Sequence, residues 1–142
     1  RGLYVYWKRT LPFPAASTFD APARDVACTR RVRSNTPLQA LTLLNDPVFM
    51  EAARALAGRV LHEAPDTQSR IARAFQLCTG RNPDPREHQW IAAFYETQLQ
   101  RLAETPAIPD SLATGETNHP EHAAWTLVCR ALLNLDETIT RD

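Results

Sequence analysis

Four prolines stand at positions where α-helices begin, and these starts constrain the fold more than any other feature of the sequence. Pro37, Pro47, Pro85 and Pro120 each open a stretch in which apolar residues recur at helical spacing. Proline suits the first helical position because its missing N–H would be unbonded there and its φ is already close to the helical value. The sequence therefore predicts an all-α fold.

Polar residues beside these prolines complete the helix ends. Thr36 and Gln39 form a capping box, in which each side chain can bond to the backbone N–H of the other residue. Asp46 is expected as an N-cap, and Gly80 as a left-handed residue that closes a helix. We expect an irregular bundle of four to five helices, at residues 37–44, 47–62, 67–79, 85–104 and 120–134.

Apolar stripes indicate which side of each helix is buried. In the second, third and fourth helices the expected stripes are Phe49, Ala52, Ala53, Leu56 and Val60; Ile71, Ala74, Phe75 and Cys78; and Ile91, Phe94, Tyr95, Gln98 and Leu102. The last helix has two apolar faces, made of Ala124, Leu127, Val128, Ala131 and Leu135, and of Trp125, Cys129 and Leu132. Because its apolar coverage is so wide, we expect it to be the central helix.

The first thirty-five residues lack a helical period and are rich in proline and aromatic residues, which indicates an extended arm. Its aromatic residues need a surface to cover them, either the helices of this chain or a missing upstream domain. They are Tyr4, Tyr6, Trp7, Phe13 and Phe19. The expected organisation is an arm at residues 1–35 and a helical domain at residues 36–142.

The charge balance argues against two classes of partner. The chain has 16 basic and 16 acidic residues and no net charge. Nucleic-acid binders need an excess of basic side chains to displace counterions from phosphates, so no nucleic-acid partner is expected. The apolar runs are also too short to span a bilayer, so no membrane span is expected.

The three cysteines do not suggest a redox or metal motif. Cys28, Cys78 and Cys129 are far apart, and none belongs to a C-x-x-C pair. Cys78 and Cys129 fall on apolar stripes, where a cysteine is usually a small buried hydrophobe. Whether any two of them pair stays open, and no cofactor is expected in this chain.

An arginine cluster precedes the first predicted helix and has two interpretations. Arg30, Arg31 and Arg33 could bind an anion such as sulfate or phosphate, since a helix start favours negative charge. Alternatively, at least one of them pairs with a carboxylate and fixes the arm to the helical body. The candidate carboxylates are those of Asp20, Asp25 and Asp46. We favour the ion pair, because structural pairing is the commoner use of such a cluster.

Catalytic and metal-binding patterns are weak. His119 and His122 could place two imidazoles at a helix start, but a zinc site needs at least three protein ligands and only Glu121 is close in sequence. Asp136 and Glu137 are adjacent, so they point in different directions and cannot act as an acid–base pair across a substrate. No serine lies in a nucleophile motif. We therefore assign no catalytic residue and expect no enzymatic activity from this chain alone.

Three long motifs carry a resemblance to a known family. They are "LYVYWKRTLPFP", "TFDAPARDVACTRRVRSNTPLQALTLLNDPVFMEAARALA" and "AAWTLVCRALLNLDETITRD". They resemble the C-terminal domain of unknown function, called PSD-one, of large planctomycete proteins that often also carry a cytochrome-c-like domain. The resemblance implies a periplasmic or extracellular (secreted) protein and a C-terminal position in a longer chain. It implies no chemistry, and any haem would belong to another segment.

Two functional hypotheses follow. The first is a structural or interaction module, with no chemistry of its own, that docks on the upstream domains of the parent polypeptide. The second is a part of an enzyme or carbohydrate-processing assembly that binds an anionic, for example sulfated, ligand through Arg30, Arg31 and Arg33.

Overall fold

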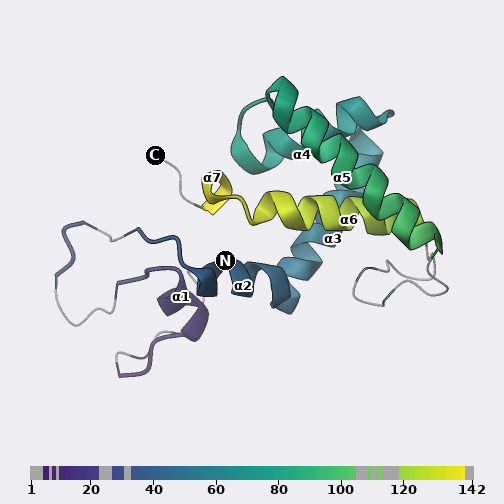
Figure 1. Cartoon of the computed structure of the whole chain (residues 1–142). Coiled ribbons are helices and arrows are strands. Elements are labelled where there is room, and N and C mark those ends of the chain that lie inside the picture. Colours follow the sequence, from purple (N-terminus) through teal and green to yellow (C-terminus); the bar gives the residue numbers. More distant parts are fainter. Residues whose placement is uncertain are drawn as a thin grey trace. The chain divides into compact units, whose positions relative to one another are not determined.

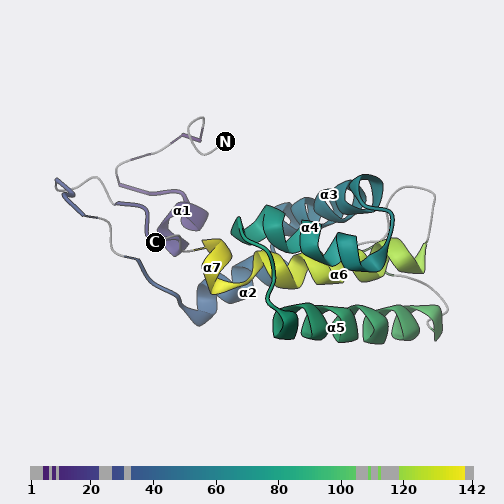
Figure 2. The same ribbon diagram turned by 90° about the horizontal axis from the view of Figure 1, so that it is seen from above.

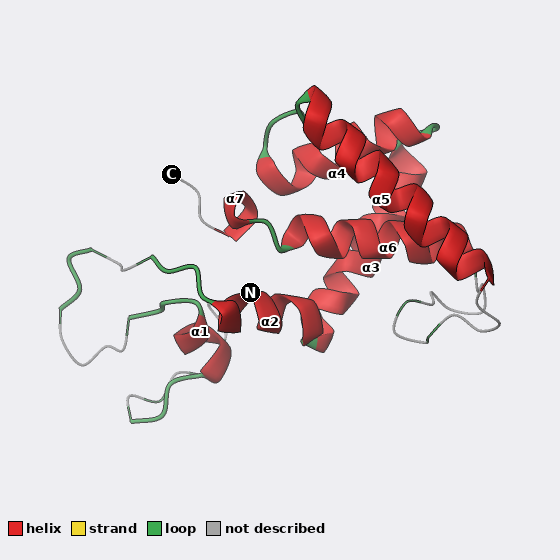
Figure 3. Ribbon diagram, in the orientation of Figure 1, coloured by secondary structure: helices red, strands yellow, loops and turns green. Residues whose placement is uncertain are grey.

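The computed structural model describes residues 5–6, 8, 10–22, 27–30, 33–104, 109, 112 and 119–139. Over these residues the regular structure is helical (Figure 3). The one exception among these residues is an isolated antiparallel bridge between Lys8 and Leu11. The helices are α1 (Pro14–Thr18), α2 (Pro37–Asn45), α3 (Pro47–Glu63), α4 (Thr67–Thr79), α5 (Pro85–Glu104), α6 (Pro120–Leu133) and α7 (Asp136–Ile139). The predicted all-α fold is confirmed.

The caps predicted for α2, α3 and α4 are present. Thr36 N donates to Gln39 Oε1 at 2.9 Å, and Gln39 N donates to Thr36 Oγ1 at 3.3 Å. Asp46 caps α3 by accepting from Val48 N at 2.9 Å. Gly80 closes α4 with a φ of 86°, a conformation that glycine adopts without steric cost. The predicted helices therefore begin and end within one residue of those in the structure.

Two short helices were not predicted. Residues 14–18 form α1 inside the segment that we expected to be an extended arm without helix, and that expectation is wrong for these residues. Residues 136–139 form α7 after the last predicted helix. Helices of one turn bury too few side chains to leave an apolar period in the sequence, so pattern analysis misses them.

The chain divides into two compact units, Arg1–Thr42 and Leu43–Asp142, which we term the N-terminal unit and the helical unit. Within the helical unit, α6 packs mainly against α3 and α5 (Figure 1). Seen from above, α6 lies between α5 on one side and the α3–α4 pair on the other (Figure 2). None of the described helices combines the length and the apolar character of a bilayer-spanning segment.

The core of the helical unit is built around α6. Trp125 is completely buried, and its ring centroid lies 4.8 Å from that of Tyr95 in α5. The core residues are Ala53, Ala57, Val60, Ile71, Ala74, Phe75, Cys78, Tyr95, Leu102, Leu112, Ala123, Ala124, Trp125, Val128, Cys129 and Leu132. Six of the sixteen belong to α6, so the prediction that this helix is central is confirmed.

The buried stripe of α3 differs from the predicted one. Ala52 is exposed, whereas Ala57, which the predicted stripe omitted, is completely buried together with Ala53. Alanines on this face let α3 approach α6 closely, and α6 presents Ala123 and Ala124 among its own buried residues. The predicted stripe favoured larger side chains, of which Leu56 is only partly buried.

Smaller departures occur in α5 and α6. Phe94 is 39% exposed, although it was expected on the buried stripe of α5. Ala131 and Leu135 are exposed, and Leu127 is only partly buried, so the first of the two predicted faces of α6 is less buried than expected. The four predicted stripe residues of α4 are all buried, as expected.

Candidate functional site

Gln39 is the centre of a polar cluster in the N-terminal unit, which we term the Asp20 cluster and which comprises Thr18, Asp20, Ser34, Thr36 and Gln39. Gln39 is only 1% exposed, although it lies in the first turn of α2. Its amide nitrogen Nε2 donates to the carbonyl oxygen of Thr18 at 2.8 Å and lies 3.1 Å from Ser34 Oγ. Its Oε1 atom accepts from Thr36 N in the capping box. One glutamine therefore ties the end of α1 to the start of α2.

The Asp20 carboxylate completes this cluster. It accepts from Ser34 N at 2.7 Å and from Ser34 Oγ at 2.7 and 2.9 Å, and its Oδ2 atom lies 3.3 Å from Gln39 Nε2. Asp20 has a φ of 57°, in the left-handed region that aspartate tolerates better than most residues. This backbone turn directly follows α1 and aims the carboxylate at Ser34. The polar groups of the cluster bond to one another, so they hold the chain rather than a substrate.

The predicted arginine site lies beside this cluster in the sequence, and the structure describes it in part. Arg30 and Arg33 are exposed, whereas Arg31 lies outside the described residues. Two features of the start of α2 disfavour an anion there: Gln39 N already donates to Thr36 Oγ1, and the negatively charged Asp20 carboxylate lies 3.3 Å from Gln39 Nε2. The anion site at Arg30, Arg31 and Arg33 stays a prediction, and so does the ion pair between one of them and a carboxylate.

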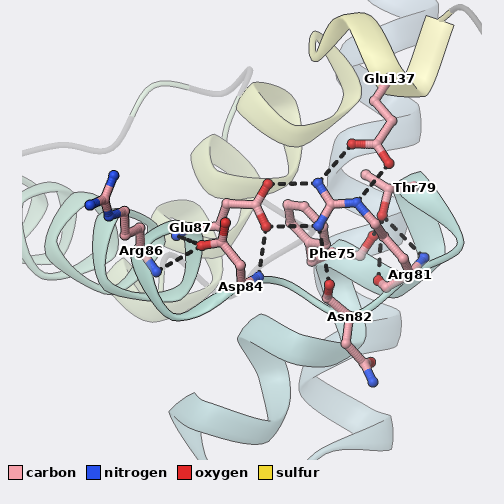
Figure 4. Close-up of polar contacts among 8 residues, drawn as sticks. All are labelled: Phe75, Thr79, Arg81, Asn82, Asp84, Arg86, Glu87 and Glu137. Atoms are coloured by element: carbon pink, nitrogen blue, oxygen red, sulfur yellow. Dashed lines mark hydrogen bonds and ion pairs between the residues drawn. The ribbon is translucent and has the colours of Figure 1, made fainter.

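A second polar cluster lies in the helical unit and surrounds Arg81 (Figure 4). The Arg81 guanidinium donates to both carboxylate oxygens of Glu87, at 2.6 and 2.8 Å, and to both of Glu137, at 2.8 and 2.9 Å. The same guanidinium lies 4.8 Å from the centroid of the Phe75 ring. Arg81 thereby connects the loop between α4 and α5 with both α5 and α7.

The electrostatics of this Arg81 cluster indicate a structural role. Hydrogen bonds from Arg81, and then from the backbone amide of Asp84, lower the pKa of Glu87 to about 2. The two carboxylates in turn raise the pKa of Arg81. The cation is already paired with two anions, so it has little capacity for an anionic ligand. The ion pairs of Arg81 were not predicted, whereas the reciprocal capping box of Asp84 and Glu87 follows a spacing that is visible in the sequence.

An open hollow of about 450 Å³ lies at the end of α3 and along α4. Its polar lining includes Glu63, Arg73, Gln76 and Asn82. Glu63 accepts from Arg73 at 2.7 Å and from Arg59 at 2.6 Å, and these bonds lower the pKa of Glu63. Arg73 also donates to Gln76 at 3.2 Å. Glu63, Arg73 and Gln76 are thus bonded to one another, and Asn82 is exposed, so no isolated buried polar group among these four residues is aimed into the hollow.

The two candidate metal ligands lie at the start of α6. His119 is exposed, whereas His122 is partly buried with Nδ1 3.4 Å from Thr126 Oγ1. Burial, and then the charge of Arg54, lower the pKa of His122. The described residues contain no group of three or more His, Cys, Asp or Glu side chains arranged to hold a metal ion.

The cysteines Cys28, Cys78 and Cys129 are free thiols. Cys78 and Cys129 are buried, as predicted from their places on apolar stripes, and Cys28 is exposed. Burial raises the pKa of Cys78 to about 11 and also raises that of Cys129. Neither buried thiol is therefore a ready nucleophile.

Comparison with protein families gives a match to the larger part of the chain. Residues 1–95 match the family model described as PSD1, a protein of unknown function (DUF1553). The matched residues include the whole of the Asp20 cluster, and they end within α5, so that α6 lies beyond them. No curated protein matches the chain, and neither does any solved structure.

Proposed function

Because the chain belongs to the PSD1 family of proteins of unknown function, we propose its role from its own residues: it is a structural or interaction module with no chemistry of its own. In this proposal the N-terminal unit docks on the upstream domains of a longer polypeptide. The family resemblance of the N-terminal motifs supports such a position, and also a periplasmic or extracellular setting.

The burial pattern of the N-terminal unit is the observation that carries this proposal. Among its described residues, the one fully buried side chain is that of Gln39, which is polar. Six of its large apolar side chains are exposed instead, among them Tyr6 at 83% and Leu11 at 73%, whereas Phe19 is partly buried. The others are Val5, Phe13, Leu38 and Leu41. The helical unit, in contrast, has a core of sixteen buried residues.

This pattern favours docking on energetic grounds. A typical hydrogen bond contributes only about 0.5–1.5 kcal/mol net, which is close to the entropy cost of ordering one residue. The Asp20 cluster by itself therefore stabilises the N-terminal unit weakly. Covering one large apolar side chain contributes roughly 1.5–3 kcal/mol, so a partner that covers several of these residues supplies the missing stability. The partner surface is expected to be apolar at its centre, because the residues to be covered are apolar.

The test measures binding between this chain and a separately expressed upstream segment of its parent polypeptide by isothermal titration calorimetry. Replacing Tyr6 and Leu11 together by serine is expected to weaken binding at least tenfold, while the unfolding temperature of the helical unit stays unchanged. Val48→Ser is the matched control, since Val48 is 68% exposed but belongs to the helical unit. Equal affinity of the double variant and the unsubstituted chain would contradict the proposal.

The exposure of Arg30 and Arg33 supports a second candidate function, binding of an anionic ligand such as a sulfated sugar. A thermal-shift series with sulfate and sulfated oligosaccharides tests it. Stabilisation that disappears when Arg30 and Arg33 are replaced by methionine would favour the ligand site. No stabilisation by any of these anions would leave the interaction module as the proposal.

A further inference from the structure

The outer face of α5 carries exposed aromatic side chains. Trp90 is 71% exposed and Phe94 is 39% exposed, one helical turn apart. The buried side of the same helix is formed by Tyr95 and Leu102. Within the helical unit α5 packs against α6 and α4, and it lies at one edge of these helices (Figure 2). Trp90 and Phe94 together form exposed apolar area that a second surface would cover.

Opposite charges stand at the two ends of this face. Arg86 and Glu104 are both exposed, and they are separated by about five turns, since an α-helix has about 3.6 residues per turn. They therefore lie on the same side of α5, which is also the side of Trp90. No carboxylate of the described residues forms an ion pair with Arg86, and its guanidinium points away from the Arg81 cluster in Figure 4. Among the same residues, no cation pairs with Glu104.

When two copies of α5 lie side by side and run antiparallel, the positive end of each helix lies beside the negative end of the other. We propose that the outer face of α5 is a homodimer interface, in which two copies pack antiparallel with Arg86 of each copy beside Glu104 of the other. A parallel pair would place like charges together, which disfavours it. The two-fold axis makes both ion pairs equivalent, as in any isologous dimer.

The residues between these charges fit the same arrangement. When position 86 faces position 104 of the partner copy, Ala93 faces Thr97, and both are small, exposed residues near the middle of α5. Small side chains at this point let the two helices approach closely, while the aromatic residues on either side supply apolar area. Arg101 faces the neutral Gln89 of the partner copy, so this register juxtaposes no like charges on that side.

The expected dimer is weak. One helix face from each copy buries less surface than the roughly 1,200–2,000 Å² of a standard interface. The dimer should therefore form and dissociate reversibly with protein concentration. It goes beyond the proposed function and does not depend on it, because it uses a surface of the helical unit rather than the N-terminal unit.

The test is sedimentation equilibrium of the full chain over a range of concentrations. The unsubstituted chain is expected to show a reversible monomer–dimer equilibrium, and Trp90→Ser is expected to weaken it. Arg86→Glu and Glu104→Arg should each weaken dimerisation by about tenfold or more, because each replaces two ion pairs with two repulsive contacts. Glu51→Arg is the matched control, an equal charge change on an exposed position of α3, which the proposed interface does not use, and it should have little effect.

Mixing the two charge variants gives the sharper test. In an equimolar mixture, the carboxylate introduced at position 86 of one variant meets the guanidinium introduced at position 104 of the other. The native Glu104 and Arg86 of the two variants meet on the other side. The mixture should therefore dimerise more tightly than either variant alone, and the double variant Arg86→Glu/Glu104→Arg should dimerise with itself.

Three results would overturn the homodimer. They are a chain that stays monomeric at the highest soluble concentration, single charge variants that dimerise as well as the unsubstituted chain, and a mixture of the two that stays monomeric. Circular dichroism of each variant checks that the helical content is retained. None of these results bears on the docking of the N-terminal unit, which calorimetry with the upstream segment measures separately.

Discussion

Replacing Gln39 by leucine should unfold the N-terminal unit while the helical unit stays folded. Leucine has nearly the same size as glutamine but makes none of its hydrogen bonds. The substitution leaves Thr36 N without the Gln39 Oε1 acceptor, 2.9 Å away, and the Thr18 carbonyl without the Nε2 donor, 2.8 Å away. Each of these two part-buried groups costs about 1–3 kcal/mol when it is left without a hydrogen bond. Because water can partly solvate both groups, we expect the free energy of unfolding of the unit to fall by about 2–4 kcal/mol in total.

Hydrogen exchange read by mass spectrometry measures this effect locally. A loss of about 2–4 kcal/mol corresponds to amide exchange roughly 30-fold to several hundredfold faster, since about 1.4 kcal/mol is a factor of ten. The faster exchange should appear at residues 15–21 and 34–42 and not in α3–α6. Leu38→Ala is the control, because Leu38 is an exposed neighbour in the same turn. Unchanged protection of residues 34–42 in Gln39→Leu would show that the cluster does not hold the unit together.

Three further measurements test the helical unit. Glu87→Gln should flatten the rise of stability with pH, measured by urea unfolding between pH 2 and 5. The pKa of Glu87 is lowered to about 2 in the folded state, so the ion pair with Arg81 stabilises the fold above the ordinary glutamate pKa of 4.5, and this stabilisation is lost as the pH falls towards 2. Because the pair is partly exposed, we expect it to contribute about 1 kcal/mol or less. Phe75→Ala should lower the free energy of unfolding by about 3–5 kcal/mol, because Phe75 is buried. Leu127→Ala should lower it by about 2 kcal/mol or less, the lower end of the range for a core leucine, because Leu127 is only partly buried. Equal losses in thermal unfolding would contradict this ranking. A thiol reagent should modify Cys28 of the native chain quickly and the two buried cysteines only on unfolding, and prompt reaction of all three would refute the burial of the pair.

The helix starts were predictable because capping is local. The bonds of the Thr36–Gln39 box join residues three positions apart, and Asp46 caps α3 through a residue two positions away. Such bonds need no tertiary contact, so the residue types and their spacing are sufficient evidence. The same reasoning found Gly80 at the end of α4, where a positive φ favours glycine.

The candidate sites were less predictable for the opposite reason. Gln39 was recognised as half of a capping box, but its bonds to Thr18 and Ser34 depend on how α1 returns to the start of α2. From the sequence, the candidate site was instead placed at Arg30, Arg31 and Arg33, because three arginines lie close together there. A charge cluster is visible in the sequence, whereas a buried amide surrounded by distant oxygen atoms is not.

The sequence by itself determined that this protein is helical, where its five long helices begin and end, and that α6 is the central one, because caps act within one turn and wide apolar coverage implies burial on several sides. Tertiary structure decided which face of α3 is buried, since close packing against α6 selects Ala53 and Ala57 rather than Ala52. It also decided that Arg81 pairs with Glu137, 56 residues away. Contacts of that kind depend on the relative placement of whole helices, and no local pattern of residue types encodes it.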